Sequence, residues 1–440
     1  MPLKLCPCPA VNLLLRDWPQ HKTDNPISEL EPILLFDRTD AISADDRKWL
    51  TNESEAVQNT NNPIRQIVES MRVKSHEDYS FIPLTIGDPS VYGNFDPSPI
   101  AVEAVKEVLD NNKDNGYGPA EGLPEARKAI SEYLEPLLSY KPDVNNIILA
   151  SGASGALEFS ITCIAERGDN ILVPRPGFPQ YSDWAVDIES LENMIDEKTR
   201  AVVFNNPSNP TGAVFKQDHM ELLVELCEKY KIPIIADEVY AGMTFNKARF
   251  ISFCQIAKSI PVIHVSSISK RFMVPGWRIG WCVVHDPIDI FKGRLTTGIK
   301  KLTTRLVGPN KLIQAAIPKI LSIPLSWHNE QNAKLEEAAN DFYNGIMHAP
   351  GLIPITPSGA MYMMVKIDFS QLKNFSDDMN FCKALVSEKS VFVLPGSCFG
   401  STDFFRVVLT ITKDKITEAC QRIVDFCKEN VKTANDSANL

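Results

Sequence analysis

The sequence predicts an α/β protein: a mostly parallel β-sheet with helices on both faces, accompanied by a smaller α+β domain. From residue 123 onward, helical segments alternate with short apolar segments rich in Ile and Val, the order that produces parallel strands joined by crossover helices. The apolar segments contain few polar positions, as strands buried on both faces do. Loops of Gly, Pro, Ser and Asn follow several of these segments, and ligands bind where such strands end.

The individual elements can be placed by apolar periodicity and by turn residues. Helical spacing begins after Asn62, and an extended segment covers residues 81–86. Helices are expected at residues 99–111, 124–138, 188–195, 219–230, 287–301 and 330–348. Strands are expected at residues 146–150, 171–174, 201–205, 232–236, 260–265 and 279–284. The last part of the chain mixes strands, near residues 361–367, 391–395 and 404–410, with helices near 379–388 and 413–430.

The 440 residues are enough for two domains and an extension. Residues 1–60 are expected to form a disordered or loosely docked N-terminal extension, because Cys6-Pro7-Cys8-Pro9 breaks any helix there. We expect residues 61–95 to join the small domain and residues 96–304 to form the large domain. Residues 305–440 would then be the small C-terminal domain.

Composition excludes several classes of partner. With 45 basic and 55 acidic residues the net charge is −10, so nucleic acid and anionic membrane surfaces are not expected partners. No apolar run approaches the roughly 18 residues of a membrane span. The ten cysteines show no paired metal-ligand spacing, which predicts buried thiols in a reducing compartment and no metal site. Acidic residues near the start argue against a transit peptide, so we expect a cytoplasmic rather than a mitochondrial protein.

A lysine and an arginine flank the turn between two apolar runs near the middle of the chain. Lys270 follows the run at residues 260–265, and Arg278 precedes the run at residues 279–284. Charges at the end of a buried strand are costly to desolvate and favour an anionic partner. A lysine in such a place can also lose its proton and react with an aldehyde. A solvated basic turn is the simpler interpretation of a single lysine.

Two further charged positions lie at strand ends or within strands. Asp237 and Glu238 follow the all-apolar strand at residues 232–236. One carboxylate there would be a cap or a surface group, but a buried one needs a cationic partner such as a protonated ring nitrogen. Arg406 lies in a half-apolar strand, where it either pairs with an internal carboxylate or binds a ligand carboxylate through two hydrogen bonds.

Two glycine-containing loops are candidate binding sites. Residues 151–156 lead from a strand into a helix, and the free N–H groups of such a helix start can bind phosphate. The same glycines could serve only to bring the helix close to the sheet. Tyr117 lies in a second loop, at residues 115–122, which is either a binding loop or a plain turn with a packed tyrosine.

Together these segments resemble the fold-type I, pyridoxal-phosphate-dependent aminotransferases, and among them most of all the tyrosine aminotransferases. The resemblance extends from about residue 62 to residue 428. It depends on six motifs in the family's order: Asn62-Pro63-Ile64-Arg65, Ile86-Gly87-Asp88-Pro89, Pro174-Arg175-Pro176-Gly177-Phe178, Asn206-Pro207-Ser208-Asn209-Pro210, Val274-Pro275-Gly276-Trp277-Arg278 and Pro357-Ser358-Gly359-Ala360-Met361-Tyr362.

The resemblance implies a role for each residue that contacts the cofactor, pyridoxal 5′-phosphate. Lys270 would hold the cofactor covalently and then act as the base that moves the substrate proton. Asp237 would pair with the ring nitrogen, and Phe178 would stack on the ring. Tyr240 and Asn209 would hydrogen-bond the phenolic oxygen of the ring. The phosphate would be bound by Gly152, Ala153, Ser154, Ser267 and Arg278.

The substrate site and the oligomeric state also follow from the resemblance. Arg406 would bind the substrate α-carboxylate, with help from Asn209 and Gly87. Tyr117 would reach the phosphate bound by a partner subunit, so a complete site would require a homodimer. The other partners implied are an amino acid and a 2-oxo acid.

The chain departs from the family in one place. Near residues 183–184 it lacks about one helix-plus-strand unit, on the order of 20 residues. The missing strand would be the edge strand of the family's sheet. We expect the fold to survive, residues 171–173 to become an exposed apolar edge, and Phe178 to lose support beside the cofactor. A splice or gene-model artefact would explain the gap equally well.

The implied function is an aromatic amino acid:2-oxoglutarate aminotransferase. It would convert L-tyrosine to 4-hydroxyphenylpyruvate with glutamate as the second product, in tyrosine and phenylalanine catabolism. An aminotransferase of alanine or kynurenine type, or a carbon–sulfur lyase, would share the same catalytic core, because substrate choice depends on the pocket. A catalytically impaired isoform that serves as a dimerising or binding subunit is a third interpretation.

Overall fold

The computed structural model describes residues 53–60, 62–71, 76–175 and 186–432. Residues 1–61 form one compact unit and residues 62–440 another. In the first unit the described residues contain only the short helix α2 (Glu55–Gln58), so most of the predicted extension lies outside the described residues. The second unit begins with α3 (Pro63–Ser70), whose predicted start at Asn62 is confirmed: its Oδ1 accepts a hydrogen bond of 3.0 Å from the N–H of Arg65.

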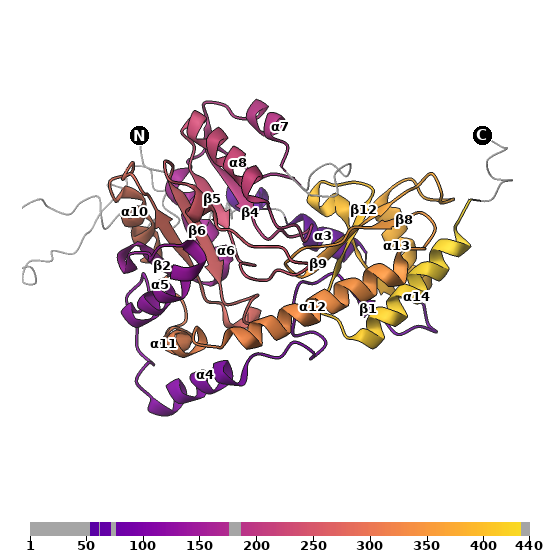
Figure 1. The fold of residues 1–440 in the computed structure, drawn as a ribbon, viewed down its shortest axis with the longest axis horizontal. Helices are drawn as coiled ribbons and strands as arrows, with labels where there is room; N and C mark the ends of the chain where they lie inside the picture. The colour runs from indigo at the N-terminus through magenta and orange to yellow at the C-terminus, as the bar shows by residue number, and fades with distance from the viewer. Residues whose placement is uncertain (1–52, 61, 72–75, 176–185, 433–440) are drawn as a thin grey trace, which may run out of the picture. The chain divides into compact units, whose positions relative to one another are not determined.

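A six-stranded sheet occupies the larger part of the second unit (Figure 1). Its strands are β2 (Ile147–Ala150), β3 (Asn170–Leu172), β4 (Thr199–Asn205), β5 (Ile234–Asp237), β6 (Val262–Ser267) and β7 (Gly280–His285), in the order β2-β7-β6-β5-β4-β3. Strands β3 to β6 are parallel to one another, and β7 is antiparallel to both of its neighbours. The predicted, mostly parallel sheet is therefore confirmed.

Alternating residues of each strand pack on opposite faces of this sheet, as the two-residue period of a strand requires. On one face Val262, Ile234 and Val202 join a core with helices α4 (Pro99–Asn111), α5 (Pro124–Leu138), α8 (Gln217–Tyr230) and α11 (Lys311–Ile320). On the other face Ile263 and Ile235 pack against α6 (Gly152–Ile164) and α10 (Arg294–Thr303). Both faces are covered, which explains the continuous apolar runs in the sequence.

A second group of elements surrounds a smaller antiparallel sheet. Its strands are β8 (Leu352–Pro354), β9 (Tyr362–Ile367), β11 (Leu394–Pro395) and β12 (Phe404–Val408), in the order β11-β12-β9-β8. Helices α12 (Leu325–Ile346), α13 (Asp378–Lys389) and α14 (Lys413–Glu429) contribute to its core. Figure 1 shows α12 running from the vicinity of α11 towards α14. A short parallel pair joins β1 (Ile82–Pro83) to β10 (Val391–Phe392).

Short elements complete the described chain: α7 (Ile188–Asn193), α9 (Phe253–Ile256), η2 (Val144–Asn146), η3 (Pro275–Trp277) and η4 (Gly396–Phe399). Some boundaries differ from expectation. The helix predicted from residue 287 begins only at Arg294, because Gly293 adopts a left-handed conformation with φ +69. The strand predicted at residues 391–395 is two short strands that pair with different partners. No helix in the described ranges combines the length and apolar character needed to cross a membrane.

Strand β3 forms one margin of the six-stranded sheet. Within the described part of the chain it pairs only with β4. Its Leu172 is buried, but the following Val173 is 65% exposed. The outer hydrogen-bonding groups of β3 thus have no strand partner among the described residues, and the exposed Val173 follows this strand directly. An unpaired apolar strand edge favours association with other β-sheets.

The packing of the six-stranded sheet gives a first prediction. Ile263 lies in β6, a central strand, and is fully buried, so Ile263→Ala should lower the free energy of unfolding by about 2–5 kcal/mol. Val173→Ala is the matched exposed control and should change it by less than about 0.5 kcal/mol. Urea unfolding of the cofactor-free protein measures both. Equal losses for the two variants would contradict this arrangement of the sheet.

Candidate active site

Several predicted site residues lie at the carboxyl ends of neighbouring strands. Asp237 is the last residue of β5, and Ser267 is the last residue of β6, three residues before Lys270. Asn209 lies four residues beyond Asn205, which ends β4. Because β4, β5 and β6 are parallel neighbours, these residues are brought to one edge of the sheet.

Lys270 is held at this edge by a segment distant in sequence. Its Nζ donates a hydrogen bond of 2.6 Å to the carbonyl oxygen of Gly87, and the side chain is half-buried. The structure therefore joins two of the predicted residues. In a solvated basic turn the amino group would point to bulk water, whereas here it donates a hydrogen bond to a backbone carbonyl. The interpretation of Lys270 as a solvated turn residue is therefore not supported.

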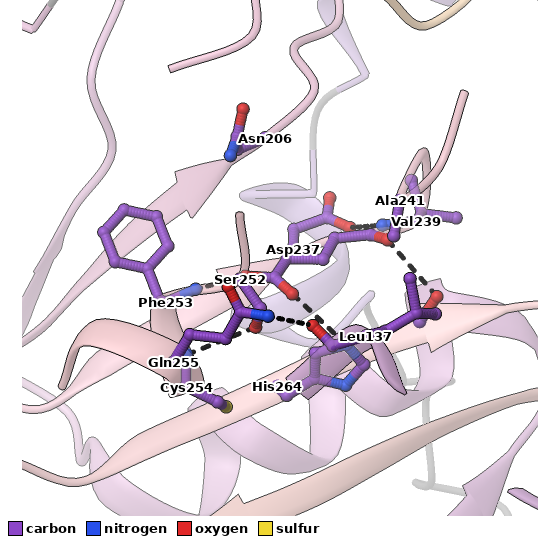
Figure 2. Close-up of polar contacts among 12 residues, drawn as sticks. Leu137, Asn206, Asp237, Val239, Ala241, Ser252, Phe253, Cys254, Gln255 and His264 are labelled. Carbon is purple, nitrogen blue, oxygen red and sulfur yellow. Dashed lines mark hydrogen bonds and ion pairs between the residues drawn. The ribbon is translucent and has the colours of Figure 1, made fainter. Parts of the chain in front are cut away.

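Asp237 presents a carboxylate that lacks a cationic partner. The N–H of Val239 donates to its Oδ1 at 3.4 Å, and Asp237 forms no ion pair within the described ranges (Figure 2). Burial raises the pKa of the Asp237 carboxyl from 3.8 to about 6, against a smaller opposing effect of the Val239 N–H. A ligand group that carries a positive charge would relieve this cost.

The next residue, Glu238, has a structural contact instead. Its Oε1 accepts a hydrogen bond of 2.8 Å from the N–H of Phe253, and its Oε2 lies 3.4 Å from Nε2 of His264. Burial raises the pKa of Glu238 to about 8 and lowers the pKa of His264 to about 3, so both groups are neutral near pH 7. Figure 2 shows Phe253 and His264 near the end of β5. Glu238 thus links β5 to α9 and β6, and Asp237 is the carboxylate left for a ligand.

The start of α6 has N–H groups that are suited to an anion. No side-chain hydrogen bond from Ser151 caps this helix, so the N–H groups of Gly152, Ala153 and Ser154 are available to an anion. Nη2 of Arg278 donates a hydrogen bond of 3.2 Å to the carbonyl oxygen of Ser151 and thereby places a positive charge beside the helix start. Gly152 is required here because its φ is +72 and a Cβ would lie 2.3 Å from Nη2 of Arg278.

Ser267 adds a hydroxyl group at the end of β6. Its Oγ accepts a hydrogen bond of 3.2 Å from the N–H of Ser269. The hydroxyl proton remains available to a ligand. The buried side chain is therefore compatible with a second contact to an anion at this edge.

Arg406 forms the other side of the site. Nη1 donates a hydrogen bond of 2.7 Å to Oδ1 of Asn209, and Nη2 donates to the carbonyl oxygen of Thr85. Nε is buried and has no hydrogen-bond partner in the described part of the chain. Burial lowers the pKa of the Arg406 guanidinium. No carboxylate among the described residues pairs with Arg406, so the alternative of an internal ion pair is not supported.

Tyr240 and Tyr362 lie between these groups. Their hydroxyl oxygens are 2.8 Å apart, and both side chains are buried. Burial, followed by the neighbouring Tyr362 hydroxyl, raises the pKa of Tyr240 well above its ordinary value. Tyr240 is consequently protonated near neutral pH and can donate a hydrogen bond.

Two predicted residues are not part of the arrangement described above. Tyr117 is 90% exposed and lies in the loop between α4 and α5, so it remains a candidate for contact with another subunit. Phe178 lies outside the described residues. The other predicted residues supply the free N–H groups at the start of α6, a carboxylate at the end of β5, a lysine beyond β6 and a guanidinium in β12, and neither the carboxylate nor the guanidinium has an ion-pair partner among the described residues.

This fold and site define a class of enzymes that act on small anionic substrates with a phosphate-bearing cofactor. The family model for aminotransferase class I and II matches residues 79–185 and 182–423. The chain belongs to this family, whose cofactor is pyridoxal 5′-phosphate.

The most similar relatives include tyrosine aminotransferases. One from Mus musculus is 36% identical over 414 residues, covering 89% of this chain and 90% of the relative. One from Dictyostelium discoideum is 38% identical, covering 88% of this chain and 98% of the relative. The crystal structure of tyrosine aminotransferase from Leishmania infantum superposes with a TM-score of 0.83 at 30% identity, covering 87% of this chain and 99% of that one.

The family match is interrupted where the sequence predicts a missing helix-plus-strand unit. The first matched segment ends at residue 185, and the second begins at residue 182. The alignment with the mouse relative spans 414 positions, whereas 89% of 440 residues is about 392, so about 22 positions have no counterpart in this chain. These figures are compatible in position and length with the predicted absence, which stays a prediction.

The described residues fit pyridoxal phosphate. The uncapped start of α6 and Arg278 suit its phosphate, and the unpaired carboxylate of Asp237 suits a protonated ring nitrogen. Lys270, three residues beyond the end of β6, has an amine that can react with its aldehyde. Buried Nε of Arg406 is left for a carboxylate.

Sequence reasoning missed three contributors to this site. Tyr362 is the last residue of the motif at residues 357–362, but the family resemblance assigns it no role. Thr85 acts through its backbone carbonyl, for which side-chain patterns give no signal. Asn205 accepts a hydrogen bond of 2.7 Å from the N–H of Asn209 and donates one of 3.0 Å to the carbonyl oxygen of Asp237; its place at the end of a strand was the only available signal.

The raised pKa of Asp237 gives a second prediction. The folded protein holds this proton more tightly than the unfolded chain, so the free energy of unfolding loses this contribution as pH rises from 3.8 through about 6. Asp237→Asn cannot ionise, and in cofactor-free protein at pH 7.5 it should therefore be more stable than the wild type by about 1–3 kcal/mol.

Urea unfolding at several pH values tests this prediction. The advantage of Asp237→Asn should shrink as the pH falls below 6 and disappear near pH 4. Saturating cofactor should reverse the order at pH 7.5, because only the wild type gains a charged partner for the ring nitrogen. A gain in stability that is independent of pH would contradict the proposed cause.

Proposed function

We propose that the protein transfers the amino group of L-tyrosine, and of other aromatic amino acids, to 2-oxoglutarate, producing 4-hydroxyphenylpyruvate and glutamate. The observation that carries this proposal is that Asp237 and Lys270 lie at or just beyond the ends of neighbouring parallel strands, while Arg406 of the smaller sheet donates a hydrogen bond to Asn209, just beyond the next strand end. Identities of 36% and 38% to tyrosine aminotransferases support the choice of substrate. Such a reaction belongs to tyrosine and phenylalanine catabolism.

The residues have distinct tasks in this reaction. Pyridoxal phosphate, when bound, supplies an aldehyde carbon that receives the amino group and a ring that withdraws electrons. Asp237 keeps a proton on the ring nitrogen. Lys270 takes the proton from the substrate Cα and delivers it to the carbon that receives the amino group. Tyr240, which stays protonated, donates a hydrogen bond to the phenolic oxygen.

Arg406 provides the site for the α-carboxylate that all substrates of this reaction share. Its guanidinium is already held by Asn209 and by the carbonyl of Thr85, so little side-chain entropy is lost when the substrate binds. A carboxylate can accept hydrogen bonds from two nitrogen atoms of one guanidinium. Binding in this manner fixes the orientation of the Cα–H bond relative to Lys270.

The oligomer, the location and the domains are part of the same proposal. We place the protein in the cytoplasm as a homodimer in which Tyr117 reaches the phosphate site of the partner. The large domain would comprise residues 96–304 without the helix-plus-strand unit near 183–184. Residues 61–95 and 305–440 would form the small domain, and residues 1–60 the extension.

Other reactions remain distinguishable by experiment. An aminotransferase with a different amino-acid preference or a carbon–sulfur lyase would use the same Lys270 and Arg406, because the reaction depends on the wider pocket. An impaired isoform would retain the fold and bind the cofactor weakly. These alternatives share the residues described above and differ in which substrates the protein turns over.

The third prediction tests the proposed reaction directly. Purified protein with pyridoxal phosphate should show visible absorbance and should turn over tyrosine with 2-oxoglutarate more efficiently than alanine, with no cleavage of cystathionine. Lys270→Ala should lose both the absorbance of the covalently bound cofactor and essentially all turnover, a loss of at least about 10⁴-fold for a group that acts as base and as nucleophile.

The outcomes separate the alternatives. Borohydride reduction followed by peptide mapping should place the label on Lys270. Labelling with preferred turnover of alanine or cystathionine would overturn the proposed substrate. Failure to label Lys270, together with no turnover of any of these substrates, would indicate an impaired isoform.

The fourth prediction concerns the subunit arrangement. Lys270→Ala and Tyr117→Ala subunits, mixed and refolded together, should form hybrids in which one site carries both defects and the other carries neither. With random pairing the mixture should recover about a quarter of wild-type activity, far above either variant alone. If Tyr117 served the site of its own subunit, mixing would recover nothing.

A further inference from the structure

We propose that Tyr362 is a positioning residue that couples the cofactor side of this site to its substrate side, through Tyr240 and Arg406 respectively. Tyr362 is the first residue of β9 in the smaller sheet, and its side chain is 2% exposed. It contacts Arg406 in the smaller sheet and Tyr240, which lies three residues beyond the end of β5. The inference rests on the proposed function and assigns a role within it.

The first contact is the hydroxyl pair. The oxygens of Tyr240 and Tyr362 are 2.8 Å apart, the usual length of a hydrogen bond between hydroxyl groups. The two rings meet edge to face, with centroids 5.8 Å apart and planes at 83°. Each hydroxyl carries one proton, so only one of the two can donate to the other.

The proposed function decides the direction of this hydrogen bond. If Tyr240 donates its proton to the phenolic oxygen of the cofactor, its own oxygen can only accept from Tyr362. A hydroxyl group that accepts one hydrogen bond is polarised and becomes a stronger donor in the next. Tyr362 therefore strengthens the hydrogen bond from Tyr240, favours the ionised phenolic oxygen and lowers the pKa of the lysine-bound chromophore.

The second contact is between the Tyr362 ring and Arg406. Cζ of Arg406 lies 4.3 Å from the centroid of this ring and 4.9 Å from the centroid of Phe399. A guanidinium at this distance from a buried aromatic ring is attracted to it. Together with the hydrogen bond to Asn209, these rings fix the group that would receive the α-carboxylate.

A third contact connects Tyr362 to the segment that holds the catalytic lysine. A Cβ at Gly87 would lie 2.0 Å from the hydroxyl oxygen of Tyr362 and 2.9 Å from its Cζ. The carbonyl oxygen of the same Gly87 accepts the hydrogen bond from Lys270. Position 87 therefore accommodates only glycine, because the hydroxyl of Tyr362 lies against it. This hydroxyl is thus beside the backbone that orients Lys270.

The two halves of Tyr362 can be tested separately, which gives the fifth prediction. Tyr362→Phe removes the hydroxyl and keeps the ring: the pKa of the visible chromophore should rise by about half a unit or more, since its polarising effect on Tyr240 is lost. KM for tyrosine and for 2-oxoglutarate should change by less than about 3-fold. Tyr362→Leu also removes the ring, and KM for both substrates should rise by about 10-fold.

A double variant distinguishes positioning from general structural support. If Tyr362 acts through Tyr240, then Tyr240→Phe and Tyr240→Phe/Tyr362→Phe should titrate with the same chromophore pKa, because the second substitution has nothing left to polarise. Spectrophotometric pH titration measures all four proteins. Circular dichroism and thermal unfolding serve as checks that each variant is folded.

The possible results are separable. An unchanged chromophore pKa in Tyr362→Phe, or independent additive shifts in the double variant, would overturn the role of the hydroxyl. Equal KM values for Tyr362→Phe and Tyr362→Leu would overturn the role of the ring. Wild-type protein that binds pyridoxal phosphate without visible absorbance would overturn the proposed function itself, and the inference with it.

Discussion

The free-energy cost of two charged groups without ion-pair partners among the described residues, Asp237 at the end of β5 and the buried Arg406 in β12, is the constraint on which the proposed site depends. Asp237 has no cationic partner and Arg406 has no anionic partner in the described part of the chain, and burial shifts the pKa of each towards its neutral form. In a protein without a ligand these groups lower stability. The carboxylate of Asp237 is complementary to a protonated ring nitrogen, and the guanidinium of Arg406 is complementary to a substrate carboxylate. Ligands with these groups would therefore be bound in preference to ligands without them, because only they pair the buried charges.

The fold places these charges without large local distortion. The parallel strands β4, β5 and β6 end at one edge of the sheet, so their last residues lie at that edge. Glu238 directly follows Asp237 in the sequence, yet its side chain contacts Phe253 and His264 and is neutral near pH 7. The two successive carboxylates at the end of β5 therefore have different surroundings, because neighbouring residues of an extended chain point to opposite sides.

Much of this arrangement was predictable from the sequence. The strand ends, the start of α6 and the positions of Asp237 and Lys270 follow from apolar runs that stop at polar or small residues, and the resemblance to the aminotransferases implies the role of Arg406. Contacts across the chain were not predictable. The carbonyl oxygens of Gly87 and Thr85 accept hydrogen bonds from Lys270 and Arg406, respectively. Every residue has a backbone carbonyl, so a pattern of side chains cannot indicate which carbonyl will make such a contact. Strand β8 and helix α9 are too short to produce a periodic signal.

By itself, the sequence determined the order of strands and helices, because local periodicity and turn residues are encoded over a few neighbouring positions, and its motifs carried the family resemblance that implies roles for Lys270, Asp237 and Arg406. Only the tertiary structure decided which of those groups meet. Tyr362 contacts Tyr240 and Arg406, which are 122 residues before it and 44 residues after it in the chain. Such contacts arise when the smaller sheet packs near the ends of β4 to β6, and they depend on distances that no local pattern specifies.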